Sequence, residues 1–376
     1  MKRSTWLILL IVTVLFAGAA VWSVTERNAR LAARDYGTPL FPGLDGANVN
    51  RIAELRLDTG HEAWTLKREA SGRWVMVERA GYPVDPDRVK QAVVALANAT
   101  ILAPRTADPA QHHRLNLDPP AAVDSEDDVT SIALSARGAD GAVMADLLIG
   151  KVKALPTSRD PGQAYVRRAG EDRTWLVEGR FDIRKDPTAW LDKTLFRIPR
   201  EEISAITVHH PDGEVLRLVR NRFGTLNIAD LPDDRASRDV RLTATQRALE
   251  FLPFADVKPA AEVDMSDATV TTLYADDGTA VTVRSAPAGF QVDKDPGYWV
   301  TFSIEHDPEL ATTPDDLPIP GPNDEGKQRE VDVDAGAARA TEAQARTDGW
   351  AYLFAEFTAQ NFRHTLETLS EPKEES

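Results

Sequence analysis

The side chains best suited to metal binding in this chain of 376 residues are its histidines, because cysteine is absent. His209 and His210 are adjacent in a predicted strand, and neighbouring strand residues point to opposite faces, so they cannot easily share one ion. His112 and His113 lie in a predicted loop beside Asp118, where the sequence leaves their geometry open. We therefore expect no metal site and assign surface or structural roles to all the histidines, namely His61, His112, His113, His209, His210, His306 and His364.

Carboxylates are the second group that could do chemistry. Asp124, Glu126 and Asp128 resemble the start of a calcium loop, but Val129 stands where the loop needs glycine and Ser135 replaces its last glutamate. A pair of acids for glycoside hydrolysis stays open, because spacing in sequence does not fix separation in space. No nucleophile-elbow, Walker, zinc-protease or dinucleotide-binding motif is present. We therefore predict no catalytic residue and no cofactor.

The charge balance narrows the class of partner. Lysine and arginine number 44 against 59 acidic residues, so the formal net charge is −15. Nucleic-acid-binding proteins usually carry a basic surplus that meets the phosphates, so we expect no nucleic acid as a partner.

Residues 6–24 predict an uncleaved transmembrane anchor. These nineteen residues carry no charge and follow Lys2 and Arg3. A helix of this length rises ~29 Å, close to the ~30 Å hydrocarbon core of a bilayer. A cleaved signal peptide is the alternative, since Ala17-Gly18-Ala19 offers a small-residue cleavage site. A short basic tail of residues 1–5 that stays in the cytoplasm would place the bulk of the chain outside it.

Two further segments are predicted to lack a packed core. Residues 25–48 contain several glycines and prolines and read as a linker from the membrane to the body. Residues 305–348 carry twelve acidic against four basic residues, which is −8 of the total −15, and predict a mobile acidic insertion with a transient helix over 331–346. Residues 371–376 form a tail.

The rest of the chain contains an internal sequence repeat. Residues 52–76 and 203–228 share alternating apolar residues, glycine turns, and an arginine at the same position, Arg68 and Arg220. This period of two indicates half-buried antiparallel strands. A helix follows each copy, starting at Asp85-Pro86 in the first and at a capping box, Thr243 to Gln246, in the second.

The closing parts of the two copies also correspond. Hairpins turn at Asp140-Gly141 and at Asp277-Gly278, and closing strands follow at residues 164–177 and 298–353. We match Trp190-Leu191 with Phe362-Arg363. The sequence therefore predicts an α+β fold of two tandem related lobes of antiparallel strands with short helices, preceded by one transmembrane helix. The lobes are expected over residues 49–198 and 199–370.

One run of residues resembles a known family. Tyr165-Val166-Arg167, Trp175-Leu176-Val177 and the run from Pro187 to Leu195, together with Trp350-Ala351-Tyr352, are similar to the bacterial domain of unknown function 4340. The resemblance implies envelope proteins associated with ABC-type transport or gliding-motility-like complexes as accessory parts, and it supplies no catalytic residues. The residues that carry it and could contact a partner are Tyr165, Trp175, Trp190, Asp192 and Trp350.

The sequence thus predicts a non-catalytic, membrane-anchored accessory or scaffold protein that acts by binding. We place it in the bacterial inner membrane through residues 6–24, as a single-pass protein with its bulk in the periplasm. An envelope glycan hydrolase with paired carboxylates and a solute-binding protein are the alternatives. At strand and helix-start positions, the tryptophans at 175, 190, 299 and 350 are expected to be core anchors first and partner contacts second.

Overall fold

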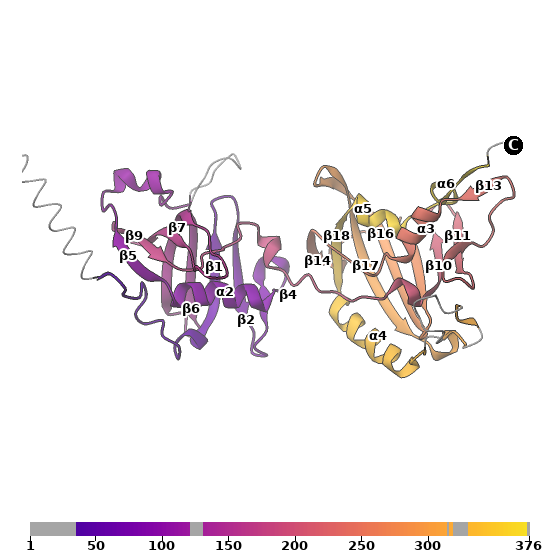
Figure 1. Ribbon diagram of the computed structural model, residues 1–376, viewed down its shortest axis with the longest axis horizontal. Helices are drawn as coiled ribbons and strands as arrows, with labels where there is room; N and C mark the ends of the chain where they lie inside the picture. Colours follow the sequence, from indigo (N-terminus) through magenta and orange to yellow (C-terminus); the bar gives the residue numbers. More distant parts are fainter. Residues whose placement is uncertain (1–34, 121–130, 314–315, 319–329, 374–376) are drawn as a thin grey trace, which may run out of the picture. The chain divides into compact units, whose positions relative to one another are not determined.

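The computed structural model describes residues 35–120, 131–313, 316–318 and 330–373. The chain forms two compact units, residues 1–192 and 193–376, which we call the first lobe and the second lobe. The sequence analysis divided the chain after residue 198 instead. Each lobe is built around one antiparallel sheet with a few short helices (Figure 1), which confirms the α+β class.

The predicted membrane segment at residues 6–24 and the tail at 1–5 lie outside the described residues, as do residues 25–34 of the predicted linker. Among the residues that the structure describes, no helix is both long enough and apolar enough to cross a bilayer.

The first lobe contains a sheet of nine strands in the order β4-β3-β2-β1-β6-β7-β8-β9-β5. Its strands are β1 (Ile52–Asp58), β2 (Ala63–Arg68), β3 (Trp74–Met76), β4 (Tyr82–Pro83), β5 (Thr100–Pro104), β6 (Ile132–Gly138), β7 (Val143–Ala154), β8 (Gln163–Arg168) and β9 (Thr174–Glu178). The sheet is antiparallel throughout, so short turns join most neighbours.

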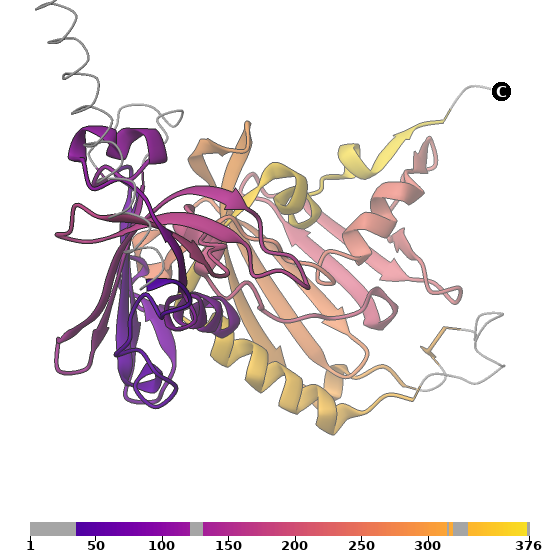
Figure 2. The same ribbon diagram turned by 60° about the vertical axis from the view of Figure 1, so that its left-hand side comes forward.

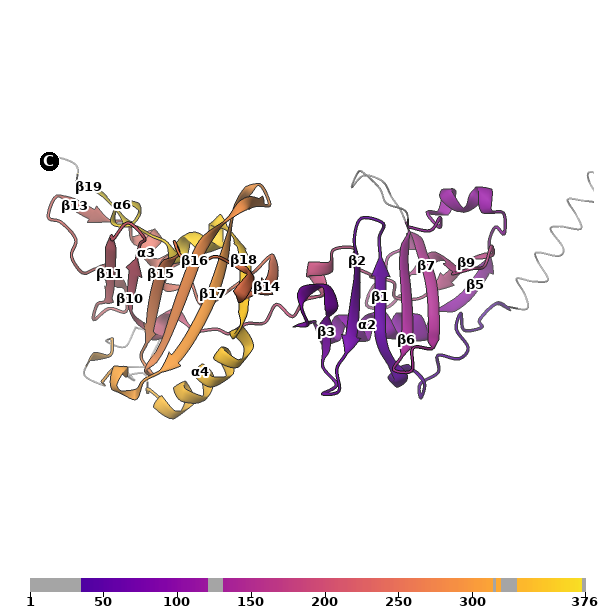
Figure 3. The same cartoon turned by 180° about the vertical axis from the view of Figure 1, so that it is seen from behind.

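The second lobe contains a sheet of eight strands in the order β12-β11-β10-β15-β16-β17-β18-β14. Its strands are β10 (Ile203–His209), β11 (Val215–Arg220), β12 (Leu226–Ile228), β14 (Asp256–Pro259), β15 (Thr269–Ala275), β16 (Thr279–Val292), β17 (Asp295–His306) and β18 (Trp350–Ala355); β13 (Arg235–Ser237) and β19 (Ser370–Pro372) pair separately. Apart from β4, the strand order matches that of the first lobe position by position. Figure 3 labels strands of each of the two sheets.

The register of the two sheets also corresponds. Leu55 faces Leu66 in the first lobe, and Ile206 faces Leu218 in the second. All four side chains are fully buried. Burying such a side chain stabilises a fold by about 1.5–3 kcal/mol, so the alternating apolar residues fix which face of each strand points inward. Ile52 and Ile203 each precede a bulge at the same place.

One of the two predicted helix starts is confirmed and the other is wrong. Asp85 caps its helix as predicted, accepting from the Asp87 amide with Pro86 at the first position. Thr243 does not begin a helix, because the helix already starts at Asp239 and ends at Gln246. The α-helices are α2 (Pro86–Ala97), α3 (Asp239–Gln246), α4 (Val333–Thr347), α5 (Glu356–Ala359) and α6 (Leu366–Leu369); the 3₁₀ segments are Val49–Arg51, Val77–Arg79, Pro109–Leu115, Pro187–Trp190, Arg200–Glu202, Ala260–Glu262, Pro308–Leu310 and Gln360–Phe362.

The matching of Trp190 with Phe362 is also corrected by the backbone contacts. The amide of Asp85 donates to the Trp190 carbonyl at 2.8 Å, and the amide of Arg238 donates to the Leu369 carbonyl at the same distance. Trp190 therefore corresponds to Leu369, and the turn Pro187–Trp190 corresponds to α6. The periodicity could not settle this, because both candidate residues are large, apolar and buried.

The acidic insertion is the largest departure from the expected loop. Its last part, Val333–Thr347, forms helix α4, which packs along β17 (Figure 2). Gly336, Ala340, Ala343 and Thr347 form the buried side of this helix. The expectation of an unpacked loop is therefore wrong for these residues, since small side chains bury a helix face without the large apolar residues that usually signal one.

Candidate binding groove and polar centre of the second lobe

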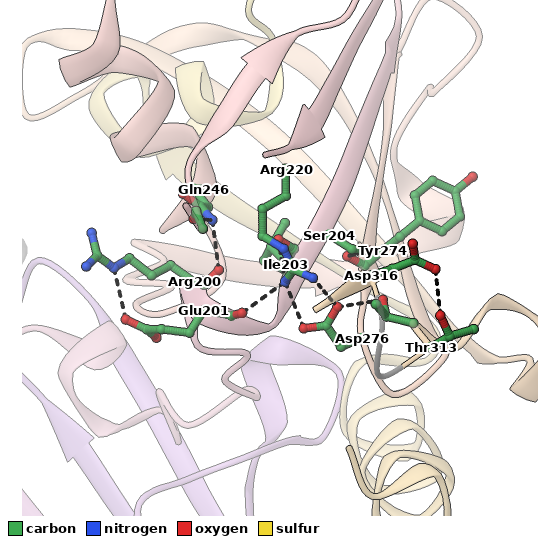
Figure 4. A network of polar contacts seen from close by, with 12 residues as sticks. Arg200, Glu201, Ile203, Ser204, Arg220, Gln246, Tyr274, Asp276, Thr313 and Asp316 are labelled. Atoms are coloured by element: carbon green, nitrogen blue, oxygen red, sulfur yellow. Dashed lines mark hydrogen bonds and ion pairs between the residues drawn. The ribbon is translucent and has the colours of Figure 1, made fainter. Parts of the chain in front are cut away.

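A buried ion pair lies at one end of the second sheet. Arg220 is the last residue of β11, and Asp276 directly follows the last residue of β15. The guanidinium donates to both carboxylate oxygens, with Nη1–Oδ2 at 2.7 Å and Nη2–Oδ1 at 2.6 Å (Figure 4). The two side chains are 4% and 1% exposed. This two-point contact fixes both the distance and the plane of the pair.

The other polar contacts of the pair hold the surrounding backbone. Arg220 Nη1 also donates to the Glu201 carbonyl at 3.0 Å, and the Thr312 hydroxyl donates to Asp276 Oδ1 at 2.6 Å. Burial lowers the pKa of Arg220 from its ordinary value. A buried pair is tolerated only when its hydrogen bonds are satisfied, so these contacts tie residues 201, 276 and 312 into one arrangement.

A second set of charged side chains holds helix α4 against the turn that follows β15. Arg339 of α4 donates to Glu202 Oε2 at 2.6 Å and forms an ion pair with Asp277. Asp277 also accepts from the Thr279 amide at 3.0 Å. A Cβ atom added to Gly336 would lie 2.6 Å from the Asp277 carboxylate, so glycine permits the close approach of the helix. We call residues Glu202, Arg220, Asp276, Asp277 and Arg339 the polar centre.

Helix α4 forms one wall of an adjoining groove. Gln344 accepts from the Ile304 amide at 2.7 Å, which fixes the helix against β17. Beside it lies a cavity of about 610 Å³, contained within the second lobe. The lining residues come from three segments: residues 193–197, residues 250–254, and Arg339, Glu342, Ala343 and Arg346 of α4.

The groove has apolar walls with charged side chains among them. Phe251 is 76% exposed, whereas Leu252 and Phe254 are buried. The lining carries four basic side chains (Lys193, Arg197, Arg339 and Arg346) and two acidic ones (Glu250 and Glu342). This composition suits a ligand with an apolar anchor and a negative charge.

The acidic side chains of the groove are already engaged. Glu250 accepts from Arg247 at 2.7 Å, and Glu342 accepts from Arg346 at 3.1 Å. Both acidic side chains of the lining are therefore hydrogen-bonded to arginines of the second lobe.

Histidines of the two lobes make contacts with the backbone. His112, His210 and His306 each place Nε2 near a backbone carbonyl, at 2.9, 3.0 and 2.9 Å respectively. Burial, with a smaller contribution from Arg241, lowers the pKa of His364 to about 4. Within the described part of the chain, no three histidine or carboxylate side chains gather closely enough to hold a metal ion. Asp124, Glu126 and Asp128 lie outside the described residues.

The structure separates the residues that the sequence analysis named as partner contacts. Tyr165 is half-buried on β8, and Trp175 lies on the next strand, 8% exposed. Trp190 is 2% exposed and donates from its indole to the Arg184 carbonyl at 3.1 Å. Asp192 donates its amide to the Pro83 carbonyl at 3.0 Å. Trp350 begins β18 in the other lobe, so no single surface of one lobe contains all five.

The residues of the polar centre were not recognised in the sequence. Arg220 was noted only as the repeat partner of Arg68, and Asp277 only as a turn residue. The contact between Arg220 and Asp276 joins residues 56 positions apart, which no local pattern encodes. A signal does exist in the repeat: the second turn reads Asp276-Asp277-Gly278, where the first reads Ala139-Asp140-Gly141.

The comparisons with known proteins add a family and no established activity. A family model described as Domain of unknown function (DUF4340) matches residues 74–270, which is more than half of the chain. The match starts in β3 and ends in β15, so it includes parts of both sheets. No curated protein and no solved structure matches the chain. The resemblance drawn from residues 165–195 is thereby confirmed.

Proposed function

We propose that this chain, which belongs to the DUF4340 family, is an accessory protein that acts by binding another protein through the groove of its second lobe. The observation that supports this is the groove itself: about 610 Å³, apolar in its walls, with Phe251 exposed at its edge. Exposed aromatic side chains at the rim of an apolar groove are characteristic anchors of protein interfaces.

The charges of the groove define the segment that it accepts. Lys193 donates to the Phe254 carbonyl at 2.9 Å and Arg346 pairs with Glu342, while Arg197 lies exposed on the lining. The basic surplus favours a partner segment with an apolar side chain that enters the groove and an acidic residue beside it. We propose a subunit of an ABC-type transport or gliding-motility-like complex as the source of this segment.

The location is part of the same proposal. The nineteen uncharged residues 6–24 are long enough to span a bilayer and would tether the two lobes outside the cytoplasm, in a periplasm. Anchoring also favours binding, because two proteins held on one membrane meet at a high effective concentration.

Co-purification of the full chain in detergent tests the proposal. We expect a defined membrane-protein partner to be retained by the unaltered chain and lost with Phe251→Glu, which places a charge at the groove edge. Phe357→Glu is the matched control, since Phe357 is 77% exposed and is not part of the groove lining. Retention of the partner by the Phe251 variant, or a chain that purifies alone, would contradict the proposal.

Cross-linking from the groove identifies the contact segment. A photoreactive residue at position 251 should label a partner peptide that contains an apolar residue next to an acidic one. Labelling of a basic peptide would contradict the charge argument. Membrane extraction provides the remaining check: the full chain should require detergent, and a chain without residues 6–24 should not.

A further inference from the structure

The first lobe has an open pocket at the place where the second lobe has its polar centre. Asn50, Arg51, Arg68 and the turn at Gly138–Asp140 line a cavity of about 490 Å³. The strand registers align Gly138 with Ala275, since they face Ile52 and Ile203 respectively. Ala139 therefore takes the place of Asp276, and Asp140 takes the place of Asp277.

Arg68 corresponds to Arg220 in position and in its backbone contact. Each ends the second strand of its sheet, and Arg68 Nη1 donates to the Asn50 carbonyl at 3.2 Å, as Arg220 does to Glu201. Because Ala139 replaces Asp276, the first lobe has no carboxylate at the position that pairs with this arginine. In the part of the chain that the structure describes, Arg68 forms no ion pair.

The nearby acids of the first lobe have arginines of their own. Asp140 lies 3.7 Å from Arg51, which stands where the second lobe has Glu202. The remaining pairs are Glu54 with Arg137 at 3.8 Å and Glu69 with Arg73 at 3.1 Å. Arg68 is thus the cation that these pairs leave over, and the pocket has a place for one added carboxylate.

The strand beside this pocket is also incompletely paired. In the second lobe, β16 pairs with β17 from Thr279 onward, and Thr279 faces His306. In the first lobe, β8 ends at Arg168, opposite Leu147 of β7. Within the described residues, no strand pairs with residues 143–146 of β7 on that side, although the Ala169 amide donates to the Asp146 carbonyl.

The second lobe fills both places with its own chain. Residues 303–306 complete the strand on β16, and the chain then turns through Pro308–Leu310 to bring Thr312 onto Asp276. The first lobe has no such segment, since β8 connects to β9 through residues 169–173. An extended segment supplied from outside can occupy the same path.

We infer that the first lobe binds an extended acidic segment of a partner protein, which adds a strand to β7 at residues 143–145 and places a carboxylate on Arg68. Strand addition provides backbone hydrogen bonds, and the arginine selects the charge. This site is independent of the groove in the second lobe, because the two share no residue.

The test uses a peptide taken from the second lobe, residues 303–313, with Thr312→Asp, and the full chain in detergent. Thr312 lies against the carboxylate of Asp276, so an aspartate at its place should reach Arg68 where Ala139 leaves room. We expect this peptide to bind about tenfold more tightly than the unaltered peptide, as for a gained charge-assisted hydrogen bond. The difference should disappear with Arg68→Gln and persist with Lys67→Gln, because Lys67 points to the opposite face of β2.

Methylation of single peptide amides tests strand addition separately. In the second lobe the Ile304 amide donates to Gln344, away from β16, so the amides of residues 303 and 305 face β16. N-methylation at Glu305 should weaken binding about tenfold, and at Ile304 it should change little. A peptide that does not bind, or one whose affinity is unchanged by both Arg68→Gln and methylation at residue 305, would overturn the inference. Loss of only one of the two effects would overturn that part of it. Phe251→Glu should leave this binding unchanged, which separates it from the proposed function.

Discussion

The turn after β6 in the first lobe and the turn after β15 in the second occupy the same place in matching sheets, but their surroundings differ. Around the second turn, Arg220 and Asp276 form a buried pair, and helix α4 docks through Arg339. Around the first turn, Arg68 lines an open pocket. A shared strand order therefore does not determine what covers the end of a sheet.

Two residue exchanges account for this difference. In the first lobe, Ala139 stands in place of Asp276, so Arg68 lacks the acid that pairs with Arg220 in the second lobe. Arg51 stands in place of Glu202 and supplies a base where the second lobe has an acid. The second turn therefore has two acids, Glu202 and Asp277, that require Arg339, whereas Asp140 is matched by Arg51 within its own lobe. The insertion and its arginine compensate a charge imbalance that the first lobe does not have.

The largest expected effect is the loss of the buried arginine. Arg220→Met removes the guanidinium from the buried Asp276 carboxylate, which should lower the free energy of unfolding of the second lobe by about 3–5 kcal/mol. Arg68→Met, at the same position of the other repeat, should cost less than ~1 kcal/mol because Arg68 is exposed. Amide hydrogen exchange in β11 and β2 measures the two lobes separately.

A double variant distinguishes charge from shape. Arg220→Met combined with Asp276→Leu removes both charges and should recover much of the stability lost in the single variant. If the Arg68 and Arg220 variants cost the same, or if the double variant is less stable than both single ones, the contrast between the lobes is wrong.

The second effect concerns pH. His364 precedes the cap of α6 and is buried, with a pKa of about 4, whereas the corresponding residue before the cap at Asp186 is the exposed Lys185. The unfolded chain binds a proton near pH 6.5 and the folded chain only near pH 4, so this stability is present above pH 6.5 and is lost as the pH falls toward 4. The loss should reach roughly 2–3 kcal/mol in the second lobe.

Replacement of the histidine tests this directly. The free energy of unfolding of the His364→Gln variant, measured by hydrogen exchange in β15 between pH 7 and pH 4, should depend less on pH than that of the unaltered chain. His61→Gln is the control, because His61 is exposed. An unchanged slope in the His364 variant would contradict the assigned protonation.

The parts of the fold that periodicity encodes were predictable from the sequence. Leu55, Leu57, Trp64 and Leu66 alternate with polar residues and are all fully buried, which is what a strand pair with one inward face requires. Asp85-Pro86 predicted the start of α2 because the cap and the proline act within one turn. Each of these signals depends only on near neighbours in the chain.

The polar centre was not predictable in the same way. Arg339 meets Glu202 across 137 positions. The buried side of α4 consists of glycine, alanine and threonine, and such small residues do not distinguish a packed helix from a loop. The negative net charge of residues 305–348 indicated disorder. However, Arg339 within this segment pairs with two acids outside it, Glu202 and Asp277. Only the folded sheet brings these charges together.

The third effect tests whether charge holds α4 in place. Arg339→Ala leaves Glu202 and Asp277 close together without their shared cation. The free energy of opening of α4, measured by amide hydrogen exchange, should therefore fall by roughly 1–2 kcal/mol. Arg346→Ala removes only an exposed ion pair with Glu342, one helical turn away, and should change this free energy of opening by ~0.5 kcal/mol or less. Equal effects of the two variants would show that α4 is held by its apolar contacts alone.

The smallest effect lies at the helix that precedes the edge strand of each sheet, α2 before β5 and α3 before β14. Asp85 accepts the Asp87 amide and caps the twelve-residue α2, whereas Arg238 at the start of the eight-residue α3 makes no side-chain cap. The first turn of α2 should therefore exchange more slowly than that of α3. Asp85→Ala should lower stability by about 1 kcal/mol and reduce the exchange protection of the first turn of α2 to about that of α3. Lys90→Ala, on the exposed face of α2, should change neither. If α3 is already as protected as α2, its tertiary contacts compensate the missing cap, and the two lobes differ only around their turns.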